Sequence, residues 1–476
     1  MSLLLQFQRG LLVWKLVWRN VQCFVYNDVR FAAWDALGKK GRPKLGLSFL
    51  KHRIGKISRT KIIMYNVLIN AYAVSPNWGS EPGMGWNWVT NLAKYCNLHV
   101  ITEGEWQKEI EDAMTNLEYA DRLHFHYINV TPEIREMCWN QGTWKFYQYY
   151  QEWERRALDK AKVIIAHEKI DIVHKLNMIG YREPSYLWEI EDIPFVWGPI
   201  GGYGAMPLAY LKGYPIKVIV KEVMKNVINY VQFRYQPRVR KAMKRSEAVV
   251  GAYKETFEAI RDVYREDVVL INETGAFVDN QAKPHKSDNQ LFKLMWVGKY
   301  DMRKQIGIAI RTMAELKDKN NIHLYVVGTG NAEDVNRYKK MVEVLGLEKN
   351  VHLLGKVPNE KTKQMMQEMD LFFFTSIHDA TSTVVPEAIS AGLPVVCHDT
   401  RGFGVIVDEK IGRKVAIKNP KNSIKQFAAI IRDLESDRNE VRRLSEWCIK
   451  KRQEISWDAN AKKMVEIYNK VIAKKS

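Results

Sequence analysis

Two lysines follow the end of an apolar run in the second half of the chain. Leu294–Val297 is followed directly by Gly298 and Lys299, and Lys304 comes after a short loop. Two ammonium groups a turn apart can clamp a diphosphate, because each donates charge-assisted hydrogen bonds to phosphate oxygens. Two ordinary surface lysines would give the same pattern, so the pair alone leaves both interpretations open.

A second apolar run, Leu324–Val327, ends in Gly328-Thr329-Gly330. Glycines at a strand end let the backbone approach a phosphate closely. The longer motif G-x-G-x-x-G is not met, because Glu333 stands where the third glycine would be. The motif therefore indicates either a phosphate-contacting loop or a turn that needs only backbone freedom.

The third apolar run ends in a group of hydroxyl residues. Leu371–Phe374 leads to residues 381–383 and then to a helix that we expect to open at Pro386 and Glu387. Free backbone N–H groups at a helix start attract phosphate, and the Glu387 carboxylate can accept hydrogen bonds from ribose hydroxyls. Simple capping of the helix by the hydroxyl residues is the alternative.

Strands and helices must position these three motifs. Apolar runs alternate with helical stretches in both halves of the chain, which predicts βαβ units and parallel sheets. Phosphorylated ligands bind where the carboxyl ends of such strands meet. In the first half, the expected elements are strands at 62–69, 99–101, 171–174 and 194–197, a glycine-bearing loop at 75–85 and helices from Gly85 and Glu152.

The charge is strongly positive and unevenly distributed. Of the net charge of +19, residues 1–61 carry +11, from 13 Lys and Arg against Asp28 and Asp35. A second basic stretch, 212–245, interleaves cations with apolar and aromatic residues. Basic, aromatic segments suit an anionic membrane surface, although a solvated basic face is the alternative. No nucleic-acid-binding motif accompanies them, so nucleic acid is not an expected partner.

Neither a membrane-spanning helix nor a set of structural disulfides is expected from the sequence. The N-terminal apolar run is interrupted by Arg9, Lys15 and Arg19, well short of the ~20 apolar residues that a spanning helix needs. It also lacks a signal-peptide cleavage pattern. The five cysteines are scattered, which favours reduced thiols. The expected location is cytoplasmic, with possible peripheral attachment to the membrane.

Residues 62–475 resemble the family-four retaining glycosyltransferases of the GT-B fold. The family's glycine-arginine and lysine-glycine pairs stand here as Gly298-Lys299 and Lys304-Gln305, and its two glutamates stand as Asp379 and Glu387. Residues 388–396 are close to its E-A-x-A-x-G-x-P-V-V run. Departures are lysine for arginine at 299, aspartate at 379, and Leu176 where a second histidine often follows His174.

The resemblance implies an α/β fold of two Rossmann-like domains facing across a cleft. The expected organisation is a basic extension that associates with membranes (1–60), an acceptor domain (61–281), a linker (282–290), a donor domain (291–455) and a helix crossing back to the first domain (456–476). The resemblance also implies site residues. The catalytic residues would be His174, Asp379 and Lys304, and the acceptor-side residues would be Glu81, Arg182, Gly201 and Gly202. The donor-binding residues would be Gly79, Ser80, Gly298, Lys299, Lys304, Gly328, Thr381, Ser382, Thr383 and Glu387.

The implied activity is sugar transfer, with retention of configuration, from a nucleotide-diphosphate sugar to a saccharide or lipid-linked saccharide in polysaccharide or glycolipid synthesis. Lysines and a helix end can stabilise the departing phosphate, so no metal or other cofactor is expected. Trp78, Trp86, Trp88 and Trp106 are candidates to stack on an acceptor, although packing in the core is the favoured alternative for each of them. The alternatives are a catalytically silent GT-B partner protein, or another GT-B enzyme such as a nucleotide-sugar epimerase or a phosphorylase.

Overall fold

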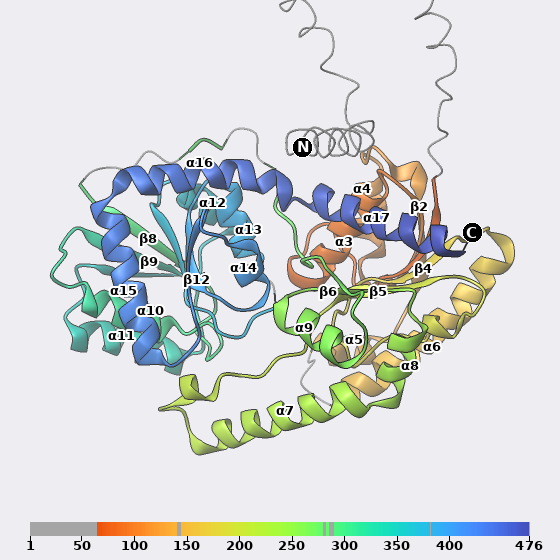
Figure 1. Ribbon diagram of the computed structural model, residues 1–476, viewed down its shortest axis with the longest axis horizontal. Coiled ribbons are helices and arrows are strands. Elements are labelled where there is room, and N and C mark those ends of the chain that lie inside the picture. Colours follow the sequence, from red (N-terminus) through yellow and green to blue (C-terminus); the bar gives the residue numbers. More distant parts are fainter. Residues whose placement is uncertain (1–63, 140–143, 279–281, 285–289, 381, 476) are drawn as a thin grey trace, which may run out of the picture. The chain divides into compact units, whose positions relative to one another are not determined.

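The computed structural model describes residues 64–139, 144–278, 282–284, 290–380 and 382–475 (Figure 1). The described elements belong to one compact unit, Met64–Ser476. The predicted extension, 1–60, lies outside the described residues, as do Thr381 and most of the predicted linker. The predicted domain bounds stay predictions.

The first half of the described chain forms a seven-stranded sheet whose strands are all parallel. The strand order is β3-β2-β1-β4-β5-β6-β7. The strands are β1 (Asn66–Asn70), β2 (Asn97–Glu103), β3 (Leu123–Ile128), β4 (Ile172–Lys175), β5 (Phe195–Ile200), β6 (Ala248–Gly251) and β7 (Val269–Leu270).

The second half forms a six-stranded parallel sheet in the order β10-β9-β8-β11-β12-β13. Its central strands are the apolar runs that the sequence shows, because strands covered on both faces are apolar throughout. The strands are β8 (Phe292–Val297), β9 (Ile322–Val327), β10 (Val351–Gly355), β11 (Leu371–Phe374), β12 (Val395–His398) and β13 (Gly412–Val415).

Helices connect the strands and cover both sheets. The first half contains α3 (Ser80–Leu92), α4 (Gln107–Met114), α5 (Pro132–Trp139), α6 (Trp144–His167), α7 (Ile216–Tyr235), α8 (Pro237–Arg245) and α9 (Lys254–Val263). The second half contains α10 (Ile306–Glu315), α11 (Ala332–Leu345), α12 (Asn359–Met366), α13 (Val384–Ser390), α14 (Arg401–Ile406), α15 (Pro420–Ser436), α16 (Arg438–Glu454) and α17 (Trp457–Lys475).

The start of α3 differs from the sequence expectation. The helix begins at Ser80, not near Gly85, so two of its glycines lie inside it rather than in the preceding loop. A Cβ on Gly83 would lie 2.2 Å from the Trp78 carbonyl oxygen, and one on Gly85 would lie 2.3 Å from the Ala73 carbonyl oxygen. These glycines therefore permit close packing against the backbone instead of ending the helix.

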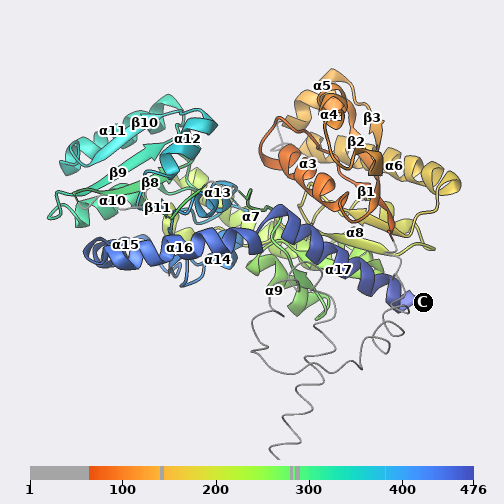
Figure 2. The same cartoon turned by 90° about the horizontal axis from the view of Figure 1, so that it is seen from above.

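The C-terminal helix returns to the first sheet, as predicted. Figures 1 and 2 show α16 and α17 in succession, and Met464 and Tyr468 of α17 are buried in the core of the first sheet. Where the chain crosses back, Ala276 forms a parallel bridge with Ser456. A Cβ on Gly275 would lie 2.5 Å from the Trp457 backbone nitrogen, so this crossing requires glycine.

A strap from the first half completes the core of the second sheet. Met206, Tyr210 and Leu211, which follow β5, are buried with Trp296 and Ile308 of the second half. The Tyr210 hydroxyl lies 2.8 Å from Ser423 Oγ, and Ser423 Oγ lies 2.9 Å from His398 Nε2. The chain then turns into α7. The sequence alone does not indicate this docking.

Candidate functional site

Each sheet reverses its winding at one point. The chain moves outward from β1 to one edge and from β4 to the other, and the second sheet does the same from β8 and β11. The loops after such neighbouring strands diverge and leave a crevice at the carboxyl ends, where ligands of open α/β sheets bind. Lys304 follows β8 and Asp379 follows β11, so both lie at this point of the second sheet.

Lys304, Asp379 and Ser382 form one cluster. The Lys304 ammonium donates a hydrogen bond to the Asp379 carboxylate and lies 3.1 Å from Ser382 Oγ. It also lies 4.8 Å from the centre of the Phe374 ring. Side chains of Lys304 and Asp379 are only 12% and 20% exposed, so their charges are partly shielded from water. A cation held there can meet an anion that enters the crevice.

The loop that carries Lys304 is fastened at both ends. Asp301 Oδ1 accepts hydrogen bonds from the backbone N–H groups of Arg303 and Lys304, at 2.9 and 3.0 Å. The buried Thr375 hydroxyl lies 2.9 Å from the Lys304 carbonyl oxygen and 3.0 Å from the Gln305 carbonyl oxygen. Gln305 has a left-handed backbone, with φ of 53°. These contacts hold the lysine at the end of β11.

Two predicted glycines bring the neighbouring loops into contact. Gly328 has φ of +132°, and a Cβ on it would lie 1.8 Å from the Gly298 carbonyl oxygen. Any other residue would therefore separate the ends of β8 and β9. A Cβ on Gly298 would lie 3.4 Å from Cγ of Lys304, so the lysine stem runs directly over this glycine.

The remaining predicted donor residues are less closely joined. Lys299 is exposed and makes no ion pair or side-chain hydrogen bond among the described residues. Helix α13 begins at Val384, two residues before the predicted start, and the N-cap residue Thr383 directly before it is exposed. Glu387 is half-buried, and this burial raises the pKa of its carboxyl group. The structure thus joins Lys304, Asp379 and Ser382 directly, whereas the predicted pairing of Lys299 with Lys304 stays a prediction.

His174 lies inside the first half rather than on a ligand-facing surface. It is fully buried, with Nδ1 2.6 Å from the Tyr468 hydroxyl and Nε2 2.6 Å from the Gly198 carbonyl oxygen. Burial lowers the pKa of His174 to about 4. The two ring nitrogens join β4 to α17 and to β5, so the contacts support a structural role and give no support to the predicted catalytic one.

The other predicted residues of the first half gather at the carboxyl edge of its sheet. Gly79 and Ser80 are exposed at the start of α3, and Ser80 has φ of 57°. Glu81 accepts a hydrogen bond from the Ile179 backbone at 3.2 Å, and burial raises the pKa of its carboxyl group. Gly201 is buried, with its N–H 2.7 Å from the Ile179 carbonyl oxygen.

Arg182 and Gly202 line a cavity of about 700 Å³. Arg182 donates to Gln232 Oε1 at 2.6 Å and to Asn229 Oδ1 at 2.7 Å, and both partners belong to α7. From the second half, the cavity receives Met302, Arg303 and His378. Residues of both halves of the described chain therefore surround one space.

Three contributors to this region were not singled out from the sequence. Arg303 and His378 line the cavity, and burial together with the nearby Arg401 lowers the pKa of His378 to about 4. Arg401 donates to the Tyr203 carbonyl oxygen at 2.9 Å, while its backbone N–H lies 3.0 Å from Glu255 Oε1. The adjacency of Arg303 to Lys304 was a usable signal, but nothing in the sequence links Arg401 to residues 203 and 255.

Of the predicted stacking tryptophans, Trp88 and Trp106 are buried. The Trp88 indole N–H donates a hydrogen bond to the Glu273 carbonyl oxygen at 2.8 Å, so Trp88 cannot stack on an acceptor without breaking this hydrogen bond. Trp86 is half-buried, and Trp78 is 50% exposed.

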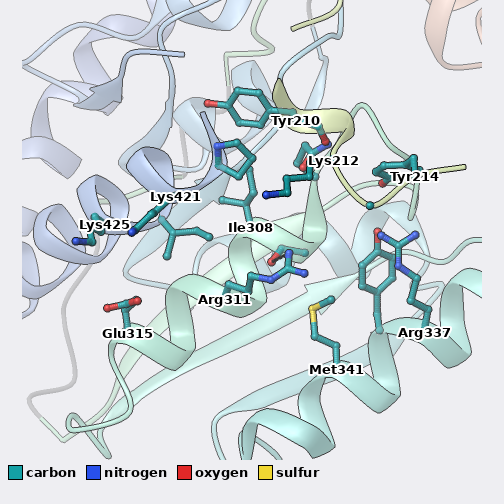
Figure 3. A pocket seen from close by; sticks show the side chains of 16 residues that line it. Tyr210, Lys212, Tyr214, Ile308, Arg311, Glu315, Arg337, Met341, Lys421 and Lys425 are labelled. Atoms are coloured by element: carbon teal, nitrogen blue, oxygen red, sulfur yellow. Dashed lines mark hydrogen bonds between the residues drawn. The ribbon is translucent and has the colours of Figure 1, made fainter. Parts of the chain in front are cut away.

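A second hollow, of about 540 Å³, lies beside α10, α11 and α15 (Figure 3). Arg311, Arg337, Lys421 and Lys425 surround it together with Lys212 from the segment before α7, and Glu315 is its only acid. It contains none of the predicted site residues, and it adds to the positive charge around the strap.

Within the described residues, no helix is long and apolar enough to cross a membrane. The same residues contain no group of three or more histidines, cysteines or acids placed to hold a metal ion. The predicted independence from metal stays a prediction.

Residues 277–451 match the family model described as Glycosyl transferases group 1. The D-inositol 3-phosphate glycosyltransferase of Corynebacterium glutamicum is 25% identical over 184 residues, which are 37% of this chain and 43% of that protein. The lipopolysaccharide glucosyltransferase WaaG of Escherichia coli is 29% identical over 126 residues, which are 26% of this chain and 32% of WaaG. These alignments thus span less than half of the length of either relative.

Among solved structures, Anabaena HepE in complex with UDP superposes with a TM-score of 0.55 at 14% identity. The superposition covers 86% of this chain and all of HepE. Together with the two parallel sheets and the returning helix, this likeness shows that the fold is GT-B. The match over residues 277–451 shows that this part of the chain is similar to the group 1 glycosyltransferases.

Proposed function

We propose that this protein is a glycosyltransferase that moves a sugar from a nucleotide-diphosphate sugar to a saccharide or lipid-linked saccharide acceptor. The observation that carries the proposal is the cluster of Lys304, Asp379 and Ser382 at the point where the second sheet reverses its winding. Relatives named as glycosyltransferases of inositol phosphate and lipopolysaccharide, and a structural neighbour solved with UDP, support it.

Cleavage of the donor builds positive charge at the anomeric carbon and negative charge on the departing phosphate. The Lys304 ammonium is the group placed to stabilise that phosphate, since it is fixed before the donor arrives. Donor binding must then replace the contact between Lys304 and Asp379, which leaves the Asp379 carboxylate to accept hydrogen bonds from donor hydroxyls. We propose no metal requirement, and retention of configuration rests on the family resemblance.

The acceptor belongs in the 700 Å³ cavity. Arg182, Arg303 and His378 offer polar contacts there, and the position of the cavity between residues of both halves would let an acceptor hydroxyl meet a sugar held by the second half. We place the protein on the cytoplasmic side of a membrane, in polysaccharide or glycolipid assembly.

A thermal-shift screen of UDP, GDP, ADP and their common sugars tests the donor half of the proposal. A ligand present at 100 times its Kd adds about 2.7 kcal/mol to the stability of the protein, so the true nucleotide should raise Tm clearly above the others. Incubation of the selected nucleotide sugar, with and without EDTA, should release nucleoside diphosphate at the same rate. A silent partner protein would release none, and an epimerase would change the sugar without releasing any.

A further inference from the structure

Helix α7 carries an exposed apolar stripe that no described element covers. Of the eighteen large apolar side chains that are exposed in the described part of the chain, nine lie on this one helix. Ile216 is 70% exposed, Val227 58% and Tyr235 63%. The full set is Ile216, Val220, Val223, Met224, Val227, Ile228, Tyr230, Val231 and Tyr235.

The nine side chains share one face of the helix. At 3.6 residues per turn, their positions fall within an arc of about 160°. Contiguous apolar patches of this kind are rare on soluble surfaces and mark places where another apolar phase binds. A hollow of about 480 Å³ runs along part of the stripe, between Ile216 and Ile228.

The opposite face of α7 borders the candidate acceptor cavity. Glu222, Asn226, Asn229 and Gln232 line that cavity, while Lys225 and Ile228 line both the cavity and the hollow on the stripe. Figure 1 shows α7 as a long helix with a free side away from both sheets. One helix therefore separates the cavity from the apolar stripe.

The charges around the stripe select its occupant. Lys217, Lys221 and Lys225 recur every four residues and so form a row along one border of the stripe. Residues 212–245 contain ten Lys and Arg, and their only acid, Glu222, is buried and paired with Lys225 at 2.6 Å. A second copy of this chain would bring two such cationic rows together, and residues 1–61 are also strongly basic. An anionic lipid surface complements both the apolar stripe and the lysine row.

We propose that α7 lies in the plane of an anionic membrane, with its apolar stripe among the acyl chains and its lysine row at the headgroups. The cavity on its other face then opens beside the headgroup layer. This deepens the proposed function, and the surface argument itself does not depend on that function.

Vesicle flotation of the full chain tests the proposal. The α7 variant is Val220→Asp, Met224→Asp and Val227→Asp, and the matched control is Val163→Asp, Val344→Asp and Leu354→Asp, three exposed apolar residues on other elements. Both variants change the net charge equally. With vesicles of phosphatidylcholine and 30% phosphatidylglycerol, the α7 variant should lose at least tenfold in partition coefficient, while the control stays within twofold of wild type.

Equal binding by wild type, α7 variant and control would overturn the proposal, because the attachment would then lie elsewhere, such as in residues 1–61. Absence of binding by wild type, with a dimer that the α7 substitutions dissociate, would assign the stripe to a second copy instead. Release of nucleoside diphosphate in the absence of vesicles reports separately on the proposed function. If release fails while the α7-dependent flotation holds, only the glycosyltransferase assignment is lost.

Discussion

At the scale of single residues, the two lysines predicted to act as a pair have different surroundings. Lys304 is held between Asp379, Ser382 and the Phe374 ring, whereas Lys299 extends into solvent. A fixed charge stabilises a developing negative charge more than a mobile, hydrated one, because no reorganisation is needed during the reaction. The sequence could identify both lysines but not this difference, which depends on contacts across some 75 residues.

Replacement of Lys304 by alanine should lower kcat for release of nucleoside diphosphate by ~10²–10³-fold, the usual effect of losing one preorganised donor. Lys299→Ala is the matched control and should lose less. Steady-state kinetics with the donor found by the ligand screen provide the measurement. A larger loss for Lys299→Ala than for Lys304→Ala would reverse the roles assigned to the two lysines.

A buried ion pair between β4 and α6 predicts a stability effect. Lys175 Nζ lies 2.7 Å from Glu154 Oε1, and the two side chains are 2% and 0% exposed. Lys175→Met should lower the free energy of unfolding by about 3–5 kcal/mol, because the Glu154 carboxylate would remain buried without its partner. Lys169→Met, at a side chain that is 86% exposed, should change it by less than about 0.5 kcal/mol. Urea denaturation at pH 7 compares them, and equal effects would contradict the argument.

At the scale of elements, the sequence predicted the strands better than the start of α3 and the long-range contacts of the strap. Leu294–Val297, Leu324–Val327 and Leu371–Phe374 were recognisable because buried parallel strands are apolar on both faces. The predicted start of α3 is too late in the sequence because glycines such as Gly83 and Gly85 are typical of loops, although here close packing requires them. The strap through Tyr210 was not foreseen, because local periodicity carries no record of a partner far away in the chain.

The crossing between the halves offers an element-scale prediction. Gly275→Ala would force a methyl group against the Trp457 backbone and should lower the free energy of unfolding by about 1–3 kcal/mol, the usual cost of overpacking. Gly180→Ala is the control, because a Cβ there meets nothing within 4 Å. Thermal unfolding of both variants gives the comparison, and a Gly275→Ala protein as stable as wild type would show that the crossing yields easily.

At the scale of the whole molecule, buried and half-buried histidines predict how stability depends on pH. The pKa values of His126, His174, His378 and His398 are each lowered to about 4, chiefly by burial. Below the ordinary pKa of about 6.5, the unfolded chain takes up protons that the folded chain does not. Stability should therefore be fully present above pH 7 and fall as the pH decreases from 6.5 toward 4.

Each of these histidines can contribute up to about 1.4 kcal/mol per pH unit within that window. Urea denaturation at pH 8, 7, 6 and 5 measures the slope, and little change is expected between pH 8 and 7. His126→Gln should reduce the loss of unfolding free energy between pH 6 and 5 by up to about 1.4 kcal/mol, the contribution of one proton. A stability that stays constant from pH 7 to 5 would rule out this account.

The strap determines which fragments of the protein can be expressed by themselves. The stretch that matches the family model, 277–451, does not contain Met206, Tyr210 or Leu211, which fill part of its own core. If this fragment is expressed by itself, the apolar side chains that pack against Met206, Tyr210 and Leu211 would be exposed to water, and the fragment should aggregate. Chimeras that exchange the second half of the chain with that of a relative must therefore include residues 206–211, or supply other side chains that fill the same space.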